Sequence, residues 1–296
     1  MDTKIGKVDV KLDRVTLTGN LKISNQELEK IMSEMSEWQL QPDYKADSPW
    51  WKMVRRVSDD VFETVAVFMK NQFQTSWRID TSNHLENDAE KLSIIRVVML
   101  MEQRHLTRID IAFDFINCKY AGMRHVLVKP GTTNTNYKEI REVEFYGRSG
   151  AFETKYLGKR RSLSMIRYYD KLVEQIKAHA SIPADIESWE RLELQLRGSR
   201  SDEWIAEVEK MLNFFKLPEV EKLDNVTDKV NLLILTEHPE IFKEFNKQKK
   251  AKYRKMYREN QGMNTEYSKN AEKVFFESVP KIQNEIDEFL AKIEQK

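Results

Sequence analysis

The stretch LTRIDIAFDF, residues 106–115, decides the fold, because polar and apolar residues alternate in it with the period of a β-strand. One face of such a strand would be apolar from residue 109 onward. The other face would carry charged side chains around one small residue: Arg108, Asp110, Ala112 and Asp114. The stretch therefore predicts a sheet with a core face on one side and two carboxylates on the other.

The chain on either side of this stretch alternates between strand and helix patterns. Strand patterns occupy residues 8–21, 60–70, 73–82, 142–150, 152–158, 164–171 and 188–198. Helical patterns occupy residues 26–38, with Ser24 and Asn25 as caps, 85–104 and 171–180, and they continue from Gly198 to the end. Residues 39–60 and 129–137 read as loops. We predict an α+β protein with a central, mostly antiparallel β-sheet flanked by helices, and a helical C-terminal third.

Composition narrows the class of protein. The 296 residues are 40% hydrophobic and 10% aromatic, which is enough to bury a substantial core. The only cysteine, Cys118, excludes a disulfide framework, and we expect a cytoplasmic protein. No apolar run approaches the roughly 20 residues of a membrane span, and the first residues are too polar for a signal peptide.

Positive charge is concentrated in one segment, although the net charge of the chain is only +1. Residues 243–258 hold eight basic residues and one acid, with aromatic residues interleaved: Lys243, Lys247, Lys249, Lys250, Lys252, Arg254, Lys255 and Arg258 are the basic ones. Such a segment attracts a polyanion and suits contact with DNA. The alternatives are a solvated helix surface and, for the aromatic residues, a place in the core.

Three acids fall on polar strand faces. The strand at 188–198 would place Trp189, Arg191, Glu193, Gln195 and Arg197 on one face, opposite three leucines. If it neighbours the strand at 106–115, Asp110, Asp114 and Glu193 would gather, and a cation would relieve their repulsion. Oxygen ligands of this kind suit a divalent metal, Mg²⁺ or Mn²⁺. The alternative is that these acids pair with Arg108 and Arg191.

A candidate nucleophile lies on the strand at 164–171. Alternation places Arg167 and Tyr169 on one side and Tyr168 on the other. A tyrosine is a poor nucleophile until a nearby cation or base favours its phenolate, because its ordinary pKa is about 10. Arg167, together with a divalent metal on a substrate phosphate, could provide that effect. The alternative is a buried tyrosine with a structural role.

Five motifs in this order resemble one family. They are TRIDIAFDF (107–115), FYGR (145–148), ETKY followed by Gly158, IRYYDK (166–171) and the strand around Arg191 and Glu193. Together they resemble the Rep_trans family of rolling-circle plasmid replication initiators, the RepC and RepD type of Gram-positive bacteria. The likeness covers most of residues 8–260.

The resemblance implies a DNA nickase and strand transferase, or relaxase, that opens the double-strand origin of a plasmid. It implies a phosphotyrosine intermediate at Tyr169, assisted by Arg167 and Arg191, and a metal-dependent endonuclease activity that uses Asp110, Asp114 and Glu193. The implied partners are hairpin or cruciform origin DNA, a second copy in a homodimer and a host helicase of the PcrA type, with no membrane. Alternatives are a non-enzymatic sequence-specific DNA-binding protein and a hydrolytic metal-dependent nuclease.

We expect three regions in the chain. Residues 1–225 would form the catalytic domain for nicking and strand transfer. Residues 226–262 would form a basic segment that binds DNA and sets origin specificity. Residues 263–296 would form a C-terminal helix of unknown role.

Overall fold

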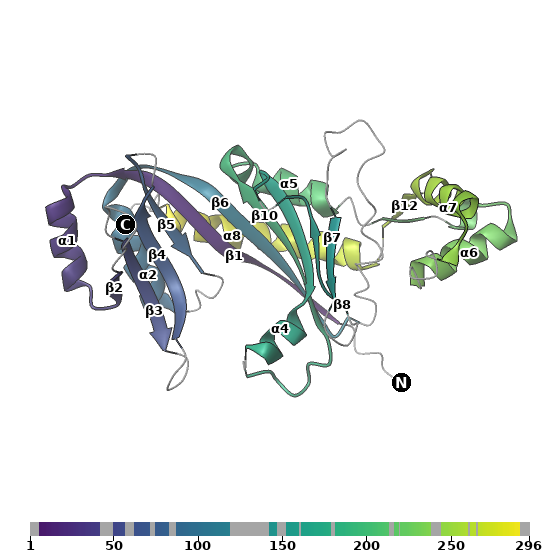
Figure 1. Ribbon diagram of the computed structural model, residues 1–296, viewed down its shortest axis with the longest axis horizontal. Coiled ribbons are helices and arrows are strands. Elements are labelled where there is room, and N and C mark those ends of the chain that lie inside the picture. Colours follow the sequence, from purple (N-terminus) through teal and green to yellow (C-terminus); the bar gives the residue numbers. More distant parts are fainter. Residues whose placement is uncertain are drawn as a thin grey trace. The chain divides into compact units, whose positions relative to one another are not determined.

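The computed structural model describes most of the chain (Figure 1). The described residues are 6–41, 50–56, 62–71, 75–82, 87–118, 142–146, 152–159, 161–178, 181–212, 216–218, 220–237, 244–259, 261–264 and 266–290. Contacts divide the chain into two compact units. Unit 1 comprises Met1–Val10, Ala112–Leu194 and Ile205–Glu277, and unit 2 comprises Lys11–Ile111, Gln195–Trp204 and Ser278–Lys296. The three regions expected from the sequence remain a prediction.

The strands are β1 (Lys7–Leu21), β2 (Trp38–Gln41), β3 (Trp50–Arg56), β4 (Phe62–Lys70), β5 (Trp77–Thr81), β6 (Met101–Ile116), β7 (Glu142–Tyr146), β8 (Phe152–Leu157), β9 (Ser164–Asp170), β10 (Trp189–Arg197), β11 (Lys216–Pro218) and β12 (Gln261–Asn264). The α-helices are α1 (Asn25–Glu34), α2 (Asp88–Met99), α4 (Lys171–Lys177), α5 (Trp204–Leu212), α6 (Val226–Glu237), α7 (Lys247–Glu259) and α8 (Glu266–Phe289), and the 3₁₀ helices are η1 (Gly198–Ser201) and η2 (Val220–Lys222). The α+β class with a large antiparallel sheet and a helical C-terminal region is confirmed.

Unit 2 is a sheet with helices beside it. The hydrogen-bonded strand order is β2-β3-β4-β5-β1-β6, and the pairings from β2 to β5 and between β5 and β1 are antiparallel. Helix α2 packs on this sheet through buried Ile94, Val97 and Val98 (Figure 1). Helix α1 begins at the predicted Ser24, whose side chain accepts a hydrogen bond from the Glu27 amide while Glu27 reaches back to Ser24.

The prediction of a loop at residues 39–60 is wrong for the residues that the structure describes there. Strands β2 and β3 occupy them, because Trp51 is buried in an aromatic cluster with Phe68 and Trp77, each ring centroid lying 6.0 Å from that of Trp51. Trp51 is therefore a core residue. The sequence hides this strand because Lys52, Arg55 and Arg56 interrupt its apolar residues.

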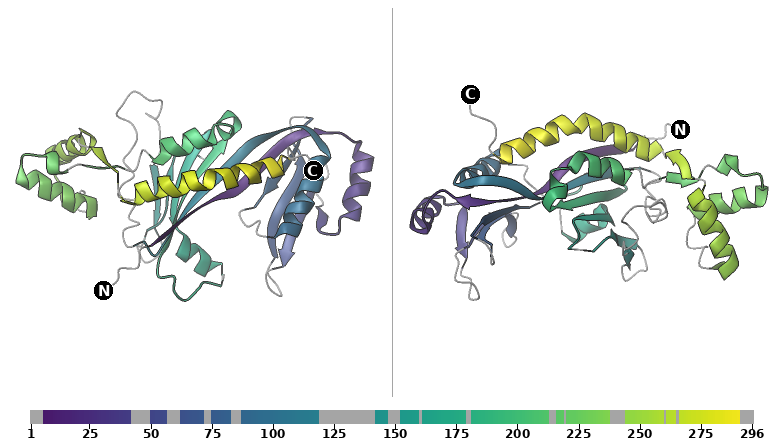
Figure 2. Two further views of the ribbon diagram at one scale, coloured as in Figure 1. Left: turned by 180° about the vertical axis from the view of Figure 1, so that it is seen from behind. Right: turned by 90° about the horizontal axis from the view of Figure 1, so that it is seen from above.

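Unit 1 contains the strand order β6-β10-β9-β8-β7. Strand β9 pairs with β8 antiparallel, with Thr154 opposite Tyr169 and Tyr156 opposite Arg167. Helix α5 and the first part of α8 cover one face of these strands (Figure 2). On that face Phe113 of β6 contacts Phe275 of α8, with ring centroids 6.0 Å apart. The apolar face predicted for residues 106–115 is thus the core face.

Two residues with positive φ shape the turns that follow β8 and β6. Gly158 follows β8 at φ +107°, and a Cβ there would lie 3.2 Å from the Ser164 carbonyl oxygen. Asn117 follows β6 at φ 52°, and its side-chain oxygen accepts hydrogen bonds from the amides of Glu187 and Ser188, just before β10. Asn117 therefore fixes the start of β10 beside the end of β6.

Helix ends differ from the sequence pattern. The helix predicted at 85–104 ends at Met99, and β6 begins at Met101, because the apolar residues that follow the helix belong to the strand. The helix predicted at 26–38 ends at Glu34, since Trp38 begins β2. The C-terminal third also contains a small sheet, β11 and β12, that the sequence did not predict. The loop expected at 129–137 lies outside the described residues.

Apolar residues near the end of α8 are buried, as expected for a helix that packs on the core. Ile282, Ile286, Phe289 and Leu290 are all buried, and Ile293 lies outside the described residues. Among the helices that the structure describes, none has the length and apolar character needed to cross a bilayer.

Candidate active site and nucleic-acid interface

Tyr169 lies at the end of β9, where three charged side chains surround it. We call Tyr169, Arg167, Lys171 and Glu193 the tyrosine site. The Arg167 Nη2 group donates a hydrogen bond to the Tyr169 hydroxyl at 3.3 Å, and the Arg167 guanidinium lies 4.4 Å from the centre of the Tyr169 ring. The Lys171 ammonium lies 5.8 Å from the same ring centre. The spacing argument for Arg167 beside Tyr169 is therefore matched by the geometry.

Lys171 is held where a strand becomes a helix. Strand β9 ends at Asp170, whose carboxylate accepts a hydrogen bond from the Val173 amide at 2.9 Å and caps α4. Lys171 is the first residue of that helix, is buried and pairs with Glu174. Strand alternation puts Lys171 on the side of Arg167 and Tyr169, but the strand ends at Asp170, so the turn from strand to helix sets the position of Lys171.

Glu193 on β10 binds Arg167. Arg167 donates a hydrogen bond from Nη2 to Glu193 Oε2, so one guanidinium contacts both the carboxylate and the phenol. Burial opposes the charge on Arg167, but Glu193, Tyr169 and Tyr156 together outweigh it, and the pKa of Arg167 lies above its ordinary value. Arg167 is thus a permanent cation of the site, with part of its charge balanced by Glu193.

The phenol of Tyr169 is protonated in this arrangement. Burial raises the pKa of Tyr169 above its ordinary value, and Arg191 and Arg167 oppose this rise only in part. Glu193 and Glu174 raise the pKa further. Arg167 does favour the phenolate, but desolvation has the larger effect in the protein without DNA.

Tyr168 occupies a different environment, as the alternation predicts. Its hydroxyl hydrogen-bonds Glu190 Oε2, and its side chain is buried. Arg167 and Lys171 lie over the ring of Tyr169. Adjacent tyrosines on one strand therefore offer a matched pair for experiment.

Asp114 and Arg191 form a buried pair between β6 and β10. Arg191 donates from Nε to Oδ1 at 2.6 Å and from Nη2 to Oδ2 at 2.7 Å, and Trp189 Nε1 donates to Oδ1 at 2.9 Å. The side chains are 1% exposed for Arg191 and 3% for Asp114. This geometry confirms that β6 and β10 are neighbours with their polar faces together. The sequence did not predict the bond from Trp189.

Asp110 belongs to unit 2. Arg108 on the same strand donates to it from Nε to Oδ1 at 2.8 Å, and burial raises the pKa of Asp110 although Arg108 opposes the rise. The alternative in which Arg108 and Arg191 pair with the strand acids is therefore the arrangement found for Asp110 and Asp114.

These acids do not fit a shared metal ion in this arrangement. Each carboxylate binds a guanidinium, and Asp114 accepts three hydrogen bonds from Arg191 and Trp189. Within the described ranges, no group of three or more His, Cys, Asp or Glu side chains could hold a metal ion. The metal roles of Asp110, Asp114 and Glu193 remain a prediction from the resemblance.

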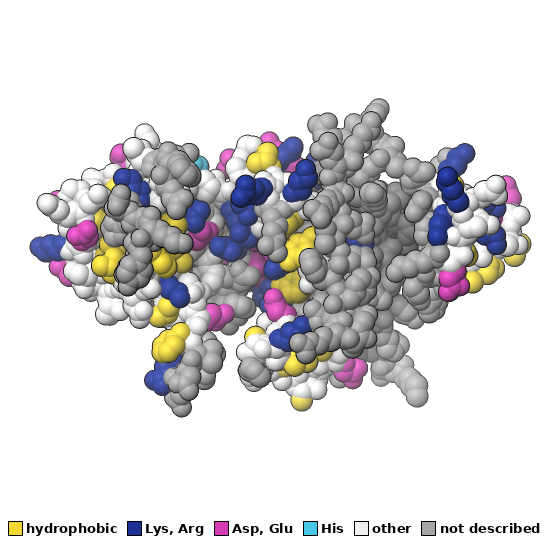
Figure 3. All heavy atoms as spheres, viewed as in Figure 1, with side chains coloured by type: hydrophobic (Ala, Val, Ile, Leu, Met, Phe, Trp, Pro, Cys, Tyr) yellow, Lys and Arg dark blue, Asp and Glu magenta, His cyan; other side chains and the backbone are white. Residues whose placement is uncertain are grey.

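Helix α7 carries the basic segment. The Asn246 side chain caps its start by accepting a hydrogen bond from the Lys249 amide at 2.9 Å. Lysine side chains lie over this helix in Figure 3. Lys247, Lys249, Lys252 and Lys255 are exposed and Lys250 is half-buried. Lys243 and the side chains of Arg254 and Arg258 lie outside the described residues.

The opposite side of α7 packs on α6. Tyr253 is buried with Leu232 in a small core, against which Phe245 and Met256 pack. The Tyr253 hydroxyl donates to Asp228 Oδ1 at 2.9 Å, and Lys252 pairs with the same oxygen at 2.7 Å. Tyr253 and Phe245 are therefore core residues, and the lysines are what α7 offers to a polyanion.

The chain is similar to known proteins in sequence. The family model Rep_trans, described as replication initiation factor, matches residues 104–255, slightly more than half of the chain. A replication initiation protein from Staphylococcus aureus is 28% identical over 252 residues, which covers 82% of this chain and 73% of the relative. A second replication initiation protein from Staphylococcus aureus is 27% identical over 258 residues, covering 83% and 74%.

One solved structure bears a weak likeness to the chain. It is a rolling circle replication initiator protein from Geobacillus stearothermophilus, with a TM-score of 0.41 and 16% sequence identity over 66% of this chain and 76% of that chain. A likeness at this level does not establish a shared function.

Proposed function

The chain belongs to the Rep_trans family of replication initiation factors, and we propose that it starts rolling-circle replication of a plasmid by nicking the double-strand origin. The observation that carries this proposal is the tyrosine site, where one phenol contacts a guanidinium that is itself held by a carboxylate. Such a group of charges suits attack on a phosphodiester, because the cations can stabilise negative charge that develops on the phosphate.

The chemical step is a transesterification at Tyr169. The phenol releases its proton to water, and its oxygen then bonds to the phosphorus of the scissile phosphodiester. The bond from phosphorus to the 3′ oxygen breaks, and that oxygen takes a proton from water. The products are a 5′ phosphotyrosine and a free 3′-OH, and the same step in reverse joins DNA ends without ATP.

The surrounding residues have separate roles in this proposal. Arg167 contacts the phenol and would lie beside the entering phosphate, where its charge also favours the phenolate. Lys171 adds a second cation at the ring. Arg191 is a positioning residue, because its guanidinium already donates hydrogen bonds to both carboxylate oxygens of Asp114. Asp110 takes no part in the step.

A divalent metal ion, Mg²⁺ or Mn²⁺, remains a separate prediction from the resemblance. It would require Asp114 or Glu193 to exchange a guanidinium for the metal when DNA binds. Nicking that continues unchanged after a chelator removes divalent metal ions would contradict this prediction and leave the role of Tyr169 unaffected. Nicking that stops on chelation and returns with Mn²⁺ would support it.

The partners follow from the chemistry and the basic helix. Exposed lysines on α7 would contact the phosphates of the origin duplex and position the protein on a hairpin or cruciform. One usable tyrosine in each chain leaves the second strand transfer to another copy, so we propose a homodimer. A host helicase would unwind the DNA beyond the nick.

Formation of the covalent adduct tests the proposal. The protein is incubated with a hairpin oligonucleotide of a candidate origin that is labelled at its 3′ end, and the products are separated on a denaturing gel. Transesterification moves the 3′ label to the mass of a protein-DNA adduct, because the protein retains the 5′ phosphate side of the nick. An oligonucleotide labelled at its 5′ end should be shortened without any shift to the protein.

Adjacent tyrosines give the matched control. Tyr169→Phe should abolish the adduct, and Tyr168→Phe should retain it, provided that both variants show the wild-type circular dichroism spectrum. Cleavage by Tyr169→Phe without an adduct would favour a hydrolytic nuclease. DNA binding without cleavage by the wild-type protein on any origin would favour a non-enzymatic DNA-binding protein.

A further inference from the structure

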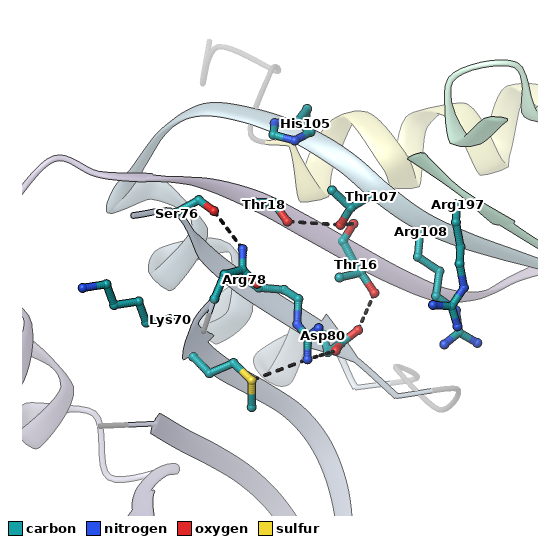
Figure 4. A pocket seen from close by; sticks show the side chains of 12 residues that line it. Thr16, Thr18, Lys70, Ser76, Arg78, Asp80, His105, Thr107, Arg108 and Arg197 are labelled. Atoms are coloured by element: carbon teal, nitrogen blue, oxygen red, sulfur yellow. Dashed lines mark hydrogen bonds and ion pairs between the residues drawn. The ribbon is translucent and has the colours of Figure 1, made fainter. Parts of the chain in front are cut away.

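Unit 2 contains a pocket of about 970 Å³ whose charged lining is mainly basic (Figure 4). Strands β1, β4, β5 and β6 and the end of β10 contribute its residues. We call it the cationic pocket after its four basic side chains, Lys70, Arg78, Arg108 and Arg197; Asp80 is the acid in its lining. None of these basic residues has a role in the proposed nicking chemistry.

Two of the four cations are already held by acids. Arg108 binds Asp110, and Arg78 lies 3.1 Å from Asp80 through its Nη2 group. Lys70 and Arg197 differ, since the side chain of neither makes a hydrogen bond or ion pair with any residue that the structure describes. The Nε group of Arg197 is also shielded from solvent without a hydrogen-bond partner. A donor in this state indicates a place for an acceptor that is external to the chain.

Arg108 and Arg197 point into the same end of the cationic pocket (Figure 4). Burial, and then the charge of Arg108, lower the pKa of Arg197. Two like charges held together are stabilised by an anion between them. Asp110 and Asp80 offset this repulsion only in part, because the pKa of Arg197 stays below its ordinary value, so an anionic ligand would gain affinity from it.

The pocket is also suited to an extended anion by its shape. Lys70 lies at the end away from Arg197 in Figure 4, with Thr18 and Thr107 between them. The hydroxyls of these two threonines lie 3.1 Å apart, and Thr107 also donates a hydrogen bond to the Thr16 carbonyl oxygen at 3.3 Å, so the lining between the two cations is polar. A single phosphate would contact one end only, whereas a chain of phosphates could contact both.

We propose that the cationic pocket binds successive phosphates of the DNA strand on which the chain acts. This inference rests on the proposed function for the identity of the polyanion, and it adds a DNA contact in unit 2 to those of the tyrosine site and α7. Its contacts are with the sugar-phosphate backbone. They would therefore position the strand and contribute affinity without reading its sequence.

Salt dependence of DNA binding tests this inference. The full chain with Lys70→Gln and Arg197→Gln is compared with a control in which Lys22 and Lys30, exposed residues of unit 2 outside the pocket, are both changed to glutamine. Binding of a fluorescent single-stranded oligonucleotide is measured by anisotropy across a range of salt. The slope of log K against log salt should fall by about 0.7 for each phosphate that the variant no longer neutralises, hence by about 1.4 in the pocket variant. The control should keep the wild-type slope.

Two further experiments test whether the charge of Arg197 is what matters and whether the ligand is DNA or a small phosphate compound. Arg197→Lys, combined with wild-type Lys70, keeps the charge and should keep the wild-type slope. Equal slopes for the pocket variant and the control would overturn the inference. Thermal stabilisation of the wild-type protein by inorganic pyrophosphate, absent in a pocket variant that binds DNA normally, would assign the pocket to a small phosphate compound and also overturn it.

The adduct assay separates this inference from the proposed function. At saturating DNA the pocket variant should form the Tyr169 adduct at the wild-type rate, because the pocket lies outside the tyrosine site. An unchanged salt slope with normal adduct formation would reject the pocket and leave the proposed function intact. A wild-type protein that shows the salt effect but forms no adduct would reject the nicking mechanism and leave the pocket as a DNA contact.

Discussion

Arg191 and Arg197 lie six positions apart on β10 and on the same predicted face, yet their surroundings differ. Arg191 is 1% exposed and binds both oxygens of Asp114. Arg197 is half-buried, borders a pocket and has no partner among the described residues. A buried arginine with a bidentate acid holds the fold together, whereas one without a partner has binding capacity left for a ligand. The contrast shows that residue type and strand face do not by themselves assign a role.

The largest effect is expected from breaking the buried pair. Arg191→Gln would leave the Asp114 carboxylate buried without its bidentate guanidinium, and we expect a loss of about 3–5 kcal/mol in the free energy of unfolding. Denaturant-induced unfolding measures this loss. The double variant Arg191→Met/Asp114→Leu should lose much less, since no charge is stranded. A loss below about 1 kcal/mol in the single variant would show that the pair contributes little.

The pH dependence of nicking separates the tyrosine site from the buried pair. The pKa of Tyr169 lies above its ordinary value of about 10, so the phenolate is a minor species at neutral pH. The rate of adduct formation under single-turnover conditions should therefore rise about tenfold for each pH unit between about 7 and 9, without a plateau. A plateau near neutral pH would mean that bound DNA, or another group, lowers this pKa strongly.

Glu193→Gln sharpens the electrostatic account of the tyrosine site. Glu193 raises the pKa of Tyr169 and also balances the charge of Arg167, so its neutralisation should lower that pKa through both effects. Ultraviolet titration measures the change. The curve of each protein is corrected by subtracting the curve of the same protein with Tyr169→Phe, which leaves the signal of the Tyr169 phenol. Glu190→Gln, beside Tyr168, is the matched control and should leave the Tyr169 titration in place. A rise in the Tyr169 pKa would contradict this account.

The smallest effect on stability is expected from Arg197, the second arginine of the comparison. Arg197→Gln removes a cation whose pKa is already lowered by burial and by Arg108, and no described residue loses a partner. The free energy of unfolding should therefore change by no more than about 0.5 kcal/mol. A loss comparable to that of Arg191→Gln would show that Arg197 has a structural role, and the contrast along β10 would fail.

Much of the sheet was predictable because strand alternation is a local property. Residues 106–115 predict β6 with one apolar face, and the same period places Arg167 beside Tyr169 and Tyr168 opposite them. Strand β3 was missed because its burial comes from Phe68 and Trp77, which are distant in the sequence. The end of α2 was missed because the apolar pattern continues unbroken into β6.

The sequence by itself determined most strands of the large sheet, which side chains share a face on them, and the family to which the motifs belong. Only the tertiary structure decided which acids meet which arginines, that burial keeps the Tyr169 phenol protonated, and that Arg197 is left with a pocket in place of an acid. The physical reason is that alternation depends on neighbouring residues alone, whereas desolvation and ion pairing depend on strands brought together from distant parts of the chain.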